Sequence, residues 1–223
     1  GNFNEKTARV YADYGYFTAD TRITSELEKA FSGTETGLIQ DNYRYLWAAP
    51  GGMRKKITRL INREIKNARN GKPAYIIIKV NSLSDEALIA KLYEASDAGV
   101  KIRLIVRGIC CLVPSAKGFS ENIEAISIID RYLEHARVYI FGNRGKELIY
   151  LSSADLMPRN LDHRFEIGFP VLGAESRRQI RDMIEIQWKD NTKSRIIDKA
   201  QQNRYRKSRE KELTAPRGIF ITI

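Results

Sequence analysis

A strand, a helix and a second strand follow one another between residues 75 and 106, and this series constrains the fold most strongly. Residues 75–80 and 101–106 are short, apolar and rich in β-branched side chains, which is typical of buried parallel strands. Between them, residues 85–98 have a helical pattern that stops at Gly99. Because parallel strands need a long crossover connection, the pattern predicts a parallel βαβ unit.

More strands and helices are predicted around this unit. A helix follows the turn at Pro50-Gly51-Gly52 and ends at Asn70-Gly71, and a closing helix over residues 177–188 gathers its apolar side chains on one face. Further elements are expected as a helix at residues 23–31 and strands at residues 126–129, 137–141, 148–152 and 165–171. The predicted fold class is therefore α/β, with a mixed β-sheet flanked by helices.

The net charge of the chain favours certain classes of binding partner. Its 223 residues carry a net charge of +11, which favours phosphate chains, nucleotides, nucleic acid or an anionic membrane surface. Nine basic and three acidic residues between Lys193 and Arg217 account for +6 of this excess, so the end of the chain is interpreted as a basic tail. No apolar run approaches the ~20 residues that span a bilayer, which argues against a transmembrane protein.

The only two cysteines, Cys110 and Cys111, are adjacent and follow an apolar segment. They can build neither a disulfide framework nor a zinc cluster, and we expect them to be buried in a protein of a reducing compartment. The polar start lacks a signal peptide and an initiator Met, which favours a segment cut from a longer protein. We expect a cytoplasmic location, with peripheral association at the inner face of the membrane left open.

Two histidines, His135 and His163, are available for chemistry, and a lone histidine is more often structural than catalytic. The stretch from His135 onward adds polar groups at fixed spacing: His135-x-Arg137, Ser152-Ser153-x-Asp155, Arg159-Asn160 and Glu166. Several of these residues follow a predicted strand end, where α/β proteins present ligand-binding groups. Glu166 lies at a spacing that predicts a contact orienting the imidazole of His135.

This stretch resembles the second half-motif of the phospholipase D superfamily, in which His-x-Lys is usually followed by Gly-Ser-x-Asn and a later Glu. Arg137, Ser152 and Asp155 depart from that pattern. A hydrolase of the superfamily uses a pair of such motifs, with one histidine attacking phosphorus and the other donating to the leaving group. One copy is present here, which argues against a free-standing nuclease or lipase.

Four longer segments, residues 1–11, 105–110, 125–141 and 150–155, are similar to sequences of the polyphosphate kinase family. The resemblance extends to about Tyr205. The resemblance implies reversible transfer of the terminal phosphoryl of ATP to inorganic polyphosphate through a phosphohistidine. In the family the acceptor histidine, the Mg²⁺ ligands and the adenine contacts lie outside the matched part, so we expect this segment to be inactive alone. ATP, ADP, polyphosphate and a homo-oligomeric full-length enzyme are the implied partners, without specific nucleic acid.

The resemblance also implies three parts and a set of site residues. Residues 1–48 are expected to be the C-terminal remnant of a first phospholipase D-like catalytic domain, residues 49–192 a second such domain, and residues 193–223 a basic C-terminal tail. Tyr11, Arg107 and His135 are implied ATP-phosphate ligands, and His135 is also the implied catalytic histidine. No residue of the chain is predicted to bind a metal.

Physical reasoning agrees with two of these roles. Arg107 directly follows the strand at residues 101–106, so its planar guanidinium is expected to project from the carboxyl end of the sheet, where it suits phosphate oxygens. His135 is expected to act as a general acid or base toward a phosphate oxygen. The alternatives are a surface ion pair for Arg107, a structural hydrogen bond to Glu134 or Glu166 for His135, and aromatic packing for Tyr11.

A second tier of residues is predicted to line a polyphosphate channel. Arg159 and Asn160 lead it, followed by Arg131, Ser152, Ser153 and Arg164, with loop hydrogen bonding as the alternative role. Two other functions stay open for the chain. One is a phosphodiesterase of the phospholipase D superfamily that acts on nucleic acid or lipid, and the other is a basic module that binds nucleic acid through charge alone.

Overall fold

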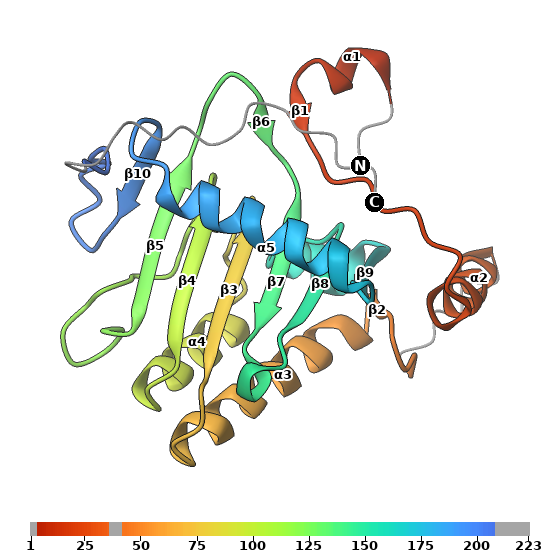
Figure 1. The fold of residues 1–223 in the computed structure, drawn as a ribbon, viewed down its shortest axis with the longest axis horizontal. Helices are drawn as coiled ribbons and strands as arrows, with labels where there is room; N and C mark the ends of the chain where they lie inside the picture. The colour runs from red at the N-terminus through yellow and green to blue at the C-terminus, as the bar shows by residue number, and fades with distance from the viewer. Residues whose placement is uncertain (1–3, 36–41, 208–223) are drawn as a thin grey trace.

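The computed structural model describes residues 4–35 and 42–207, and its centre is one eight-stranded mixed sheet (Figure 1). The order of the strands across the sheet is β10-β5-β4-β3-β7-β8-β9-β2. In chain order these strands are β2 (Trp47–Ala49), β3 (Tyr75–Val80), β4 (Lys101–Val106), β5 (Ile123–Ile128), β7 (Arg137–Phe141), β8 (Leu148–Ser152), β9 (Glu166–Pro170) and β10 (Ser194–Ile197). The predicted α/β class, a mixed sheet flanked by helices, is confirmed.

The parallel part of the sheet contains the predicted βαβ unit. Strands β3 and β4 pair in parallel with Ile78 opposite Leu104, and β4 pairs in parallel with β5. Strands β7, β8, β9 and β2 continue the sheet in antiparallel order from β3. Because β3 is covered on both faces, its side chains from Ile76 to Val80 are all buried, which explains the continuous apolar run.

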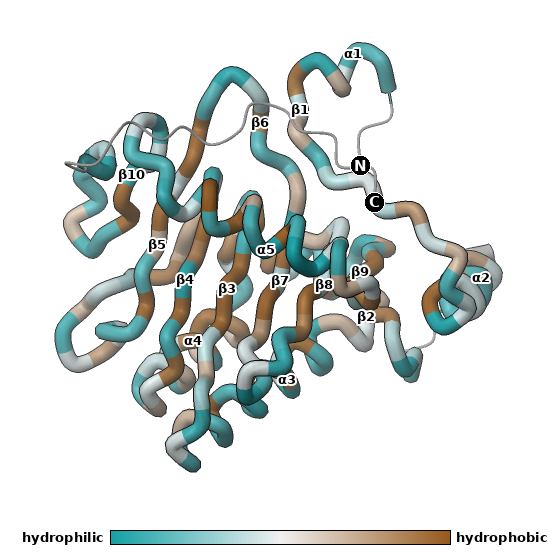
Figure 2. The backbone as a smooth tube through the Cα atoms, viewed as in Figure 1, coloured by the Kyte–Doolittle hydropathy of each residue, from teal (hydrophilic) through white to brown (hydrophobic). Residues whose placement is uncertain are grey.

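Helices cover both faces of the sheet (Figure 1). On one face, α3 (Gly52–Arg69) and α4 (Glu86–Asp97) pack on Ile76 and Ile78 of β3, and on the other, α5 (Ala174–Lys189) packs on Ile77. Figure 2 shows the resulting apolar centre along the strands, with polar residues on the outer sides of the helices. The apolar face predicted for the closing helix is buried in this layer through Ile180, Met183, Ile184 and Trp188.

Local signals explain where the helices begin and end. The carboxylate of Asp85 accepts a hydrogen bond from the Leu88 N–H at the start of α4. Gly99 follows α4 with a φ of 89°, and Gly71 follows α3 with a φ of 64°; glycine adopts this left-handed conformation without steric cost. No helix in the described part of the chain is both long and apolar enough to cross a membrane.

The shorter elements lie around the sheet. Strand β1 (Tyr11–Ala12) pairs in parallel with β6 (Leu133–Glu134), away from the main sheet. The remaining elements are α1 (Glu5–Ala8), α2 (Thr21–Glu35), the 3₁₀ turn η1 (Asn143–Gly145) and the π-helical turn η2 (Arg159–His163). Helix α2 is longer at both ends than the predicted residues 23–31.

Three sequence expectations differ from the structure. Strand β2 begins at Trp47 and strand β10 covers Ser194–Ile197, so the sheet takes strands from both sides of residues 49–192. The first residues of the predicted basic tail are therefore an edge strand, since β10 pairs with β5. Cys111 is exposed and Cys110 is only partly buried, because the loop after β4 runs along the surface. Residues 1–3, 36–41 and 208–223 of the expected parts lie outside the described residues.

Candidate active site

The β1–β6 pairing brings the N-terminal segment against the loop that carries His135. Tyr11 pairs with Leu133, and the His135 N–H donates to the Ala12 carbonyl at 3.0 Å. The Tyr11 ring then meets the His135 ring edge-on, with 4.9 Å between centroids and an interplanar angle of 71°. Two of the three residues implied as phosphate ligands therefore lie in contact.

The imidazole of His135 is held at both nitrogens. Nδ1 lies 2.9 Å from Oδ1 of Asp13, a residue 122 positions away in the chain. Nε2 lies 3.1 Å from Nη1 of Arg137, which also donates to the His135 carbonyl at 2.8 Å. Since a guanidinium nitrogen can only donate, we assign the proton of the neutral ring to Nδ1, where it is donated to Asp13.

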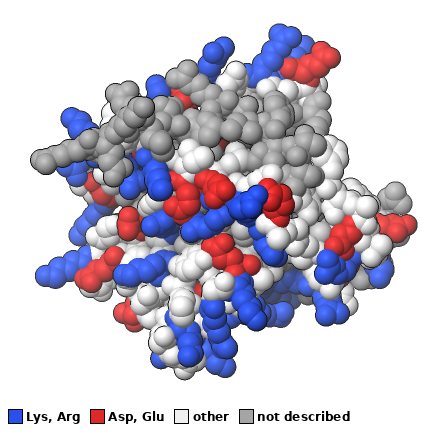
Figure 3. Space-filling model, in the orientation of Figure 1, with Lys and Arg blue, Asp and Glu red and all other residues white. Residues whose placement is uncertain are grey.

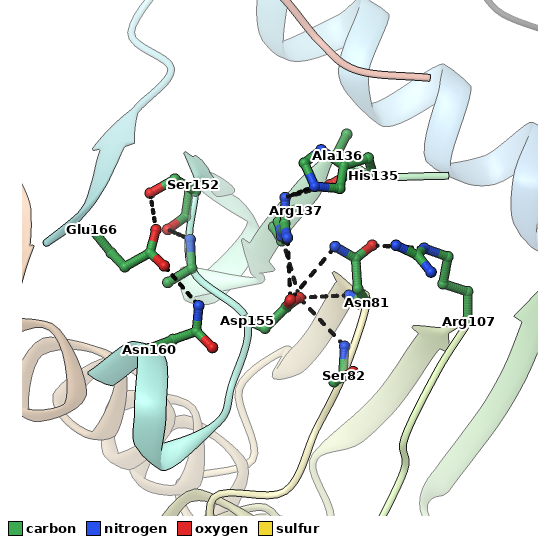
Figure 4. Close-up of polar contacts among 12 residues, drawn as sticks. Asn81, Ser82, Arg107, His135, Ala136, Arg137, Ser152, Asp155, Asn160 and Glu166 are labelled. Carbon is green, nitrogen blue, oxygen red and sulfur yellow. Dashed lines mark hydrogen bonds and ion pairs between the residues drawn. The ribbon is translucent and has the colours of Figure 1, made fainter. Parts of the chain in front are cut away.

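Arg137 and Asp155 form the centre of the site (Figure 4). The guanidinium donates to both carboxylate oxygens, from Nε at 3.2 Å and from Nη2 at 3.1 Å. Asp155 Oδ1 also accepts the backbone N–H groups of Asn81 at 2.7 Å and Ser82 at 3.3 Å, just after β3. Arg137 and Asp155, two of the three residues that depart from the half-motif, therefore form one bidentate ion pair.

Arg107 projects from the end of β4 toward the same centre (Figure 4). Its Nε donates to Asn81 Oδ1 at 3.0 Å and to the Glu134 carbonyl. Within residues 4–35 and 42–207, its two terminal nitrogens have no hydrogen-bond or ion-pair partner. Burial lowers the pKa of the guanidinium and nearby Asp155 opposes that effect, but an arginine stays protonated in a protein. The result is a fixed fork with both Nη groups available to an anion.

A buried ion pair supports the loop that carries His135. Lys79 on β3 is 3% exposed, and its Nζ lies 2.9 Å from the Ala136 carbonyl and 3.1 Å from Oε2 of Glu134. Gln187 of α5 donates to the same carboxylate oxygen at 2.9 Å. Burial lowers the pKa of the Lys79 ammonium, and the Glu134 carboxylate opposes this. The position of His135 thus depends on groups below the loop, from β3 and from α5.

Glu166 does not orient His135, which corrects the sequence expectation. Its Oε1 accepts from Asn160 Nδ2 at 2.6 Å, and its Oε2 accepts from the Ser153 hydroxyl (Figure 4). The imidazole is instead oriented by Asp13, because β1 occupies the side of the loop facing the ring. Asn160 is 2% exposed, and no described group donates to its Oδ1. The Oδ1 of Asn160 is therefore a buried acceptor without a described donor.

The other second-tier residues are spread around the site. Arg159 is exposed at the start of η2, and its side chain makes no hydrogen bond with a described residue. The Ser152 hydroxyl donates to the Ile167 carbonyl at 3.1 Å, between two strands. Arg131 lies over the ring of Tyr132, and Arg164 is exposed after η2. Of this tier, Asn160 and Ser153 share one hydrogen-bond network through Glu166, whereas the arginines remain at the surface.

The acidic groups of the site do not form a magnesium site. Asp13 faces His135, Asp155 faces Arg137, and Glu166 accepts from Asn160 and Ser153. Within the described ranges, no three His, Cys, Asp or Glu side chains are grouped so that they could hold a metal ion. Because Mg²⁺ prefers several oxygen ligands around one point and these carboxylates each face a different partner, they do not fit it.

Fold and site together define an α/β domain with a cationic centre at the carboxyl end of its parallel strands. Residues 46–215 match the family model of polyphosphate kinase C-terminal domain 2, and residues 1–37 match that of C-terminal domain 1. The chain belongs to the polyphosphate kinase family.

Individual relatives agree with this assignment. Polyphosphate kinase of Escherichia coli (strain K12) is 48% identical over 205 residues, which are 92% of this chain and 30% of that protein. Polyphosphate kinase of Vibrio vulnificus (strain CMCP6) is also 48% identical, over 92% of this chain and 29% of that protein. The crystal structure of polyphosphate kinase from Porphyromonas gingivalis aligns with a TM-score of 0.88 and 43% identity, over 96% of this chain and 33% of that one. The chain thus spans about a third of the length of these relatives.

Proposed function

We propose that this chain is the part of a polyphosphate kinase that binds the reacting phosphate groups around His135. The full-length enzyme would reversibly transfer the terminal phosphoryl of ATP to inorganic polyphosphate, through a phosphohistidine outside this chain. Residues 1–48 would be the end of a first phospholipase D-like catalytic domain and residues 49–192 the body of a second. The family membership and the cationic centre support this proposal.

One observation carries the proposal: the Arg107 guanidinium is fixed through Nε, while neither terminal nitrogen has a partner among the described residues. In phosphoryl transfer, charge spreads over the equatorial oxygens, and positioned cations stabilise it. Arg107 would donate two parallel hydrogen bonds to one phosphate group. The Tyr11 hydroxyl would donate to the same chain, since the two rings of Tyr11 and His135 are in contact.

His135 would act as a general acid or base toward a phosphate oxygen. In the described arrangement Nε2 accepts from Arg137, so a proton arriving at Nε2 would displace that donor. Arg137 would keep its bonds to the His135 carbonyl and to Asp155, and the Asp13 carboxylate would stabilise the imidazolium. Asp13 is therefore proposed as a positioning residue.

Other parts of the proposal lie beyond this chain. Mg²⁺ would accompany ATP and neutralise charge on the phosphates, and its ligands would come from outside the described residues. The full-length enzyme would be a homo-oligomer in the cytoplasm. Arg159 would contact the polyphosphate chain at the rim through its exposed guanidinium. Asn160 is buried and bonded to Glu166, so it would support the wall of the channel from behind.

Arg107→Gln in the full-length enzyme tests the proposal. Losing a bidentate, charge-assisted contact should lower kcat/KM for ATP by about 10²-fold or more, because each such bond contributes about 1.5–3 kcal/mol. Arg178→Gln is the matched control, since it removes one exposed cation from α5. Near-normal kcat/KM in Arg107→Gln would contradict the site. Hydrolysis of a phosphodiester, or equal competition by duplex DNA and polyphosphate, would favour the phosphodiesterase or the nucleic-acid module instead.

A further inference from the structure

A second group of cations surrounds a cavity of about 300 Å³ that shares no residue with the His135 site. Helix α3 contributes Lys56, Arg59 and Arg63, and Arg44 lies on the segment before β2. The rings of Tyr45 and Tyr150 complete this feature, here called the α3 cavity. None of the described residues that line the cavity is acidic, so the lining carries an excess of positive charge.

The arginines of the α3 cavity differ from those on the opposite face of the sheet. On α5, Arg178 pairs with Glu175 and Arg181 pairs with Glu185. Figure 3 shows basic and acidic side chains intermixed on that face. By contrast, the side chains of Arg44, Arg59 and Arg63 form no hydrogen bond or ion pair within residues 4–35 and 42–207.

The spacing of these cations is unfavourable for the helix itself. Arg59 and Arg63 are four residues apart on α3, and Lys56 lies three residues before Arg59. Residues at these separations are neighbours on one helix face, and like charges there repel. An anion bound between them would relieve that repulsion.

The backbone around the α3 cavity is fixed before any ligand arrives. The Glu26 carboxylate accepts the N–H groups of Arg44, Tyr45 and Leu46, at 2.6, 2.9 and 2.9 Å. From the other side, Lys56 Nζ donates to the carbonyls of Tyr43 and Leu46. This clamp holds Arg44 opposite α3 and reduces the ordering cost of binding.

Aromatic geometry indicates which part of a ligand the cavity suits. Trp47 is 2% exposed and stacks on Tyr150 with 4.1 Å between ring centroids. The Arg44 guanidinium covers the ring of Tyr45 at 5.4 Å from its centroid. Because one face of each of these rings is already covered, less ring surface remains for a nucleobase to stack on. Linked phosphate groups match the guanidinium forks instead.

We propose that the α3 cavity is a second binding site, specific for linked phosphate groups and independent of the chemistry at His135. Inorganic polyphosphate and the triphosphate of a nucleotide share this chemistry, and the site recognises the phosphates of either one. The inference goes beyond the proposed phosphoryl transfer and does not require it.

The two tryptophans of the chain make a direct test possible. In a Trp188→Phe background, Trp47 is the only tryptophan, and it lies at the floor of the α3 cavity. Titration of this chain with tripolyphosphate should give a saturable change in Trp47 emission. Arg59→Gln with Arg63→Gln should raise the half-saturating concentration at least about tenfold, because charge-assisted bonds are lost.

Matched variants and ligands decide between explanations. Arg178→Gln should change the half-saturating concentration less than about twofold, since a surface pair contributes little. Arg107→Gln should leave the Trp47 emission change intact. If the emission change disappeared in this variant, Trp47 would be reporting binding at the His135 site, which would overturn the proposal. ATP should bind about as tightly as tripolyphosphate, and AMP more weakly. Much tighter binding of ATP would overturn the phosphate assignment in favour of a base.

Weaker binding by the double variant must not result from misfolding, so its folding is checked. Arg59 and Arg63 are exposed, and glutamine is a good helix former, so the double variant should retain the wild-type circular dichroism. Arg44→Gln, outside α3, should also weaken binding. An absent or non-saturable Trp47 response in the folded parent would overturn the proposal, and so would unchanged affinity in both the double variant and Arg44→Gln.

Discussion

The His135 site and the α3 cavity both gather positive charge, but they balance it differently. Around His135, Arg137 pairs with Asp155, and Lys79 pairs with Glu134. In the α3 cavity, Arg59 and Arg63 have no described acidic partner. The difference follows from burial, because removing a charge from water is costly unless a counter-charge is present. Exposed arginines remain hydrated and do not need one.

Arg107 is the exception within the buried site. Its Nε is held by Asn81 and by the Glu134 carbonyl, while its terminal nitrogens face no described acceptor. A partly buried guanidinium with open donors costs free energy until an anion arrives. Arg137 and Lys79 therefore hold the site together, whereas Arg107 is kept available for a ligand.

Lys79→Met tests the supporting role of the buried pair and should have the largest effect on stability. It leaves the Glu134 carboxylate with Gln187 alone, so the free energy of unfolding should fall by about 3–5 kcal/mol. Urea denaturation of this chain measures it. Arg178→Met, which breaks the exposed pair with Glu175, should cost at most about 1 kcal/mol. Similar losses in both variants would contradict the comparison.

Asp13→Asn tests positioning without removing a group that touches substrate. The asparagine cannot stabilise an imidazolium, so kcat of the full-length enzyme should fall about 10- to 100-fold while KM for ATP stays close to wild type. Steady-state kinetics separates the two parameters. An increase in KM with unchanged kcat would mean that Asp13 serves binding instead.

The contribution of Lys79 to the free energy of unfolding should depend on pH, which tests whether its ammonium is buried. Burial lowers the pKa of Lys79, so the folded state binds this proton less tightly than the unfolded chain. The free-energy cost of burying the protonated Lys79 ammonium is fully present below its folded-state pKa, and it is removed as the pH rises toward 10.5. The difference in unfolding free energy between the wild type and Lys79→Met should therefore widen as the pH rises toward 10.5. A constant difference over that range would contradict a buried ammonium.

Arg59→Gln should have the smallest effect and the opposite sign. Relief of repulsion from Arg63 should raise the free energy of unfolding of the ligand-free chain by about 0.2–0.5 kcal/mol. Thermal denaturation at low salt measures it, and added salt should reduce the gain by screening. A loss of stability would show that Arg59 has a structural role in the cavity.

The sequence could predict elements whose signals are local. The apolar runs at residues 75–80 and 101–106 predicted buried parallel strands. Because the second run ends at Val106, the sequence also placed Arg107 at the carboxyl end of the sheet. Strands β2 and β10 escaped prediction because they are three and four residues long and show no alternation. Pairing with β9 and β5, rather than local propensity, makes them strands.

The candidate site could be predicted only in part, for a related reason. Tyr11 and His135 lie in ring contact, and Arg107 donates to the carbonyl of Glu134, the residue before His135. Their roles as phosphate ligands stay predictions. Asp13, by contrast, is 122 residues from His135 and carries no local signal. Its contact depends on the β1–β6 pairing, which only the folded chain creates. Glu166 was the nearer carboxylate in sequence, yet Ser153 and Asn160 occupy both of its oxygens.

The most direct measurement of the central claim is kcat for polyphosphate synthesis by the full-length enzyme carrying His135→Gln. Glutamine keeps polar contacts but cannot exchange a proton at this position, so kcat should fall by about 10²- to 10⁴-fold. The free energy of unfolding and the Trp47 response to tripolyphosphate should remain unchanged. A kcat within a few-fold of the wild type would contradict the assignment of His135 as the catalytic histidine.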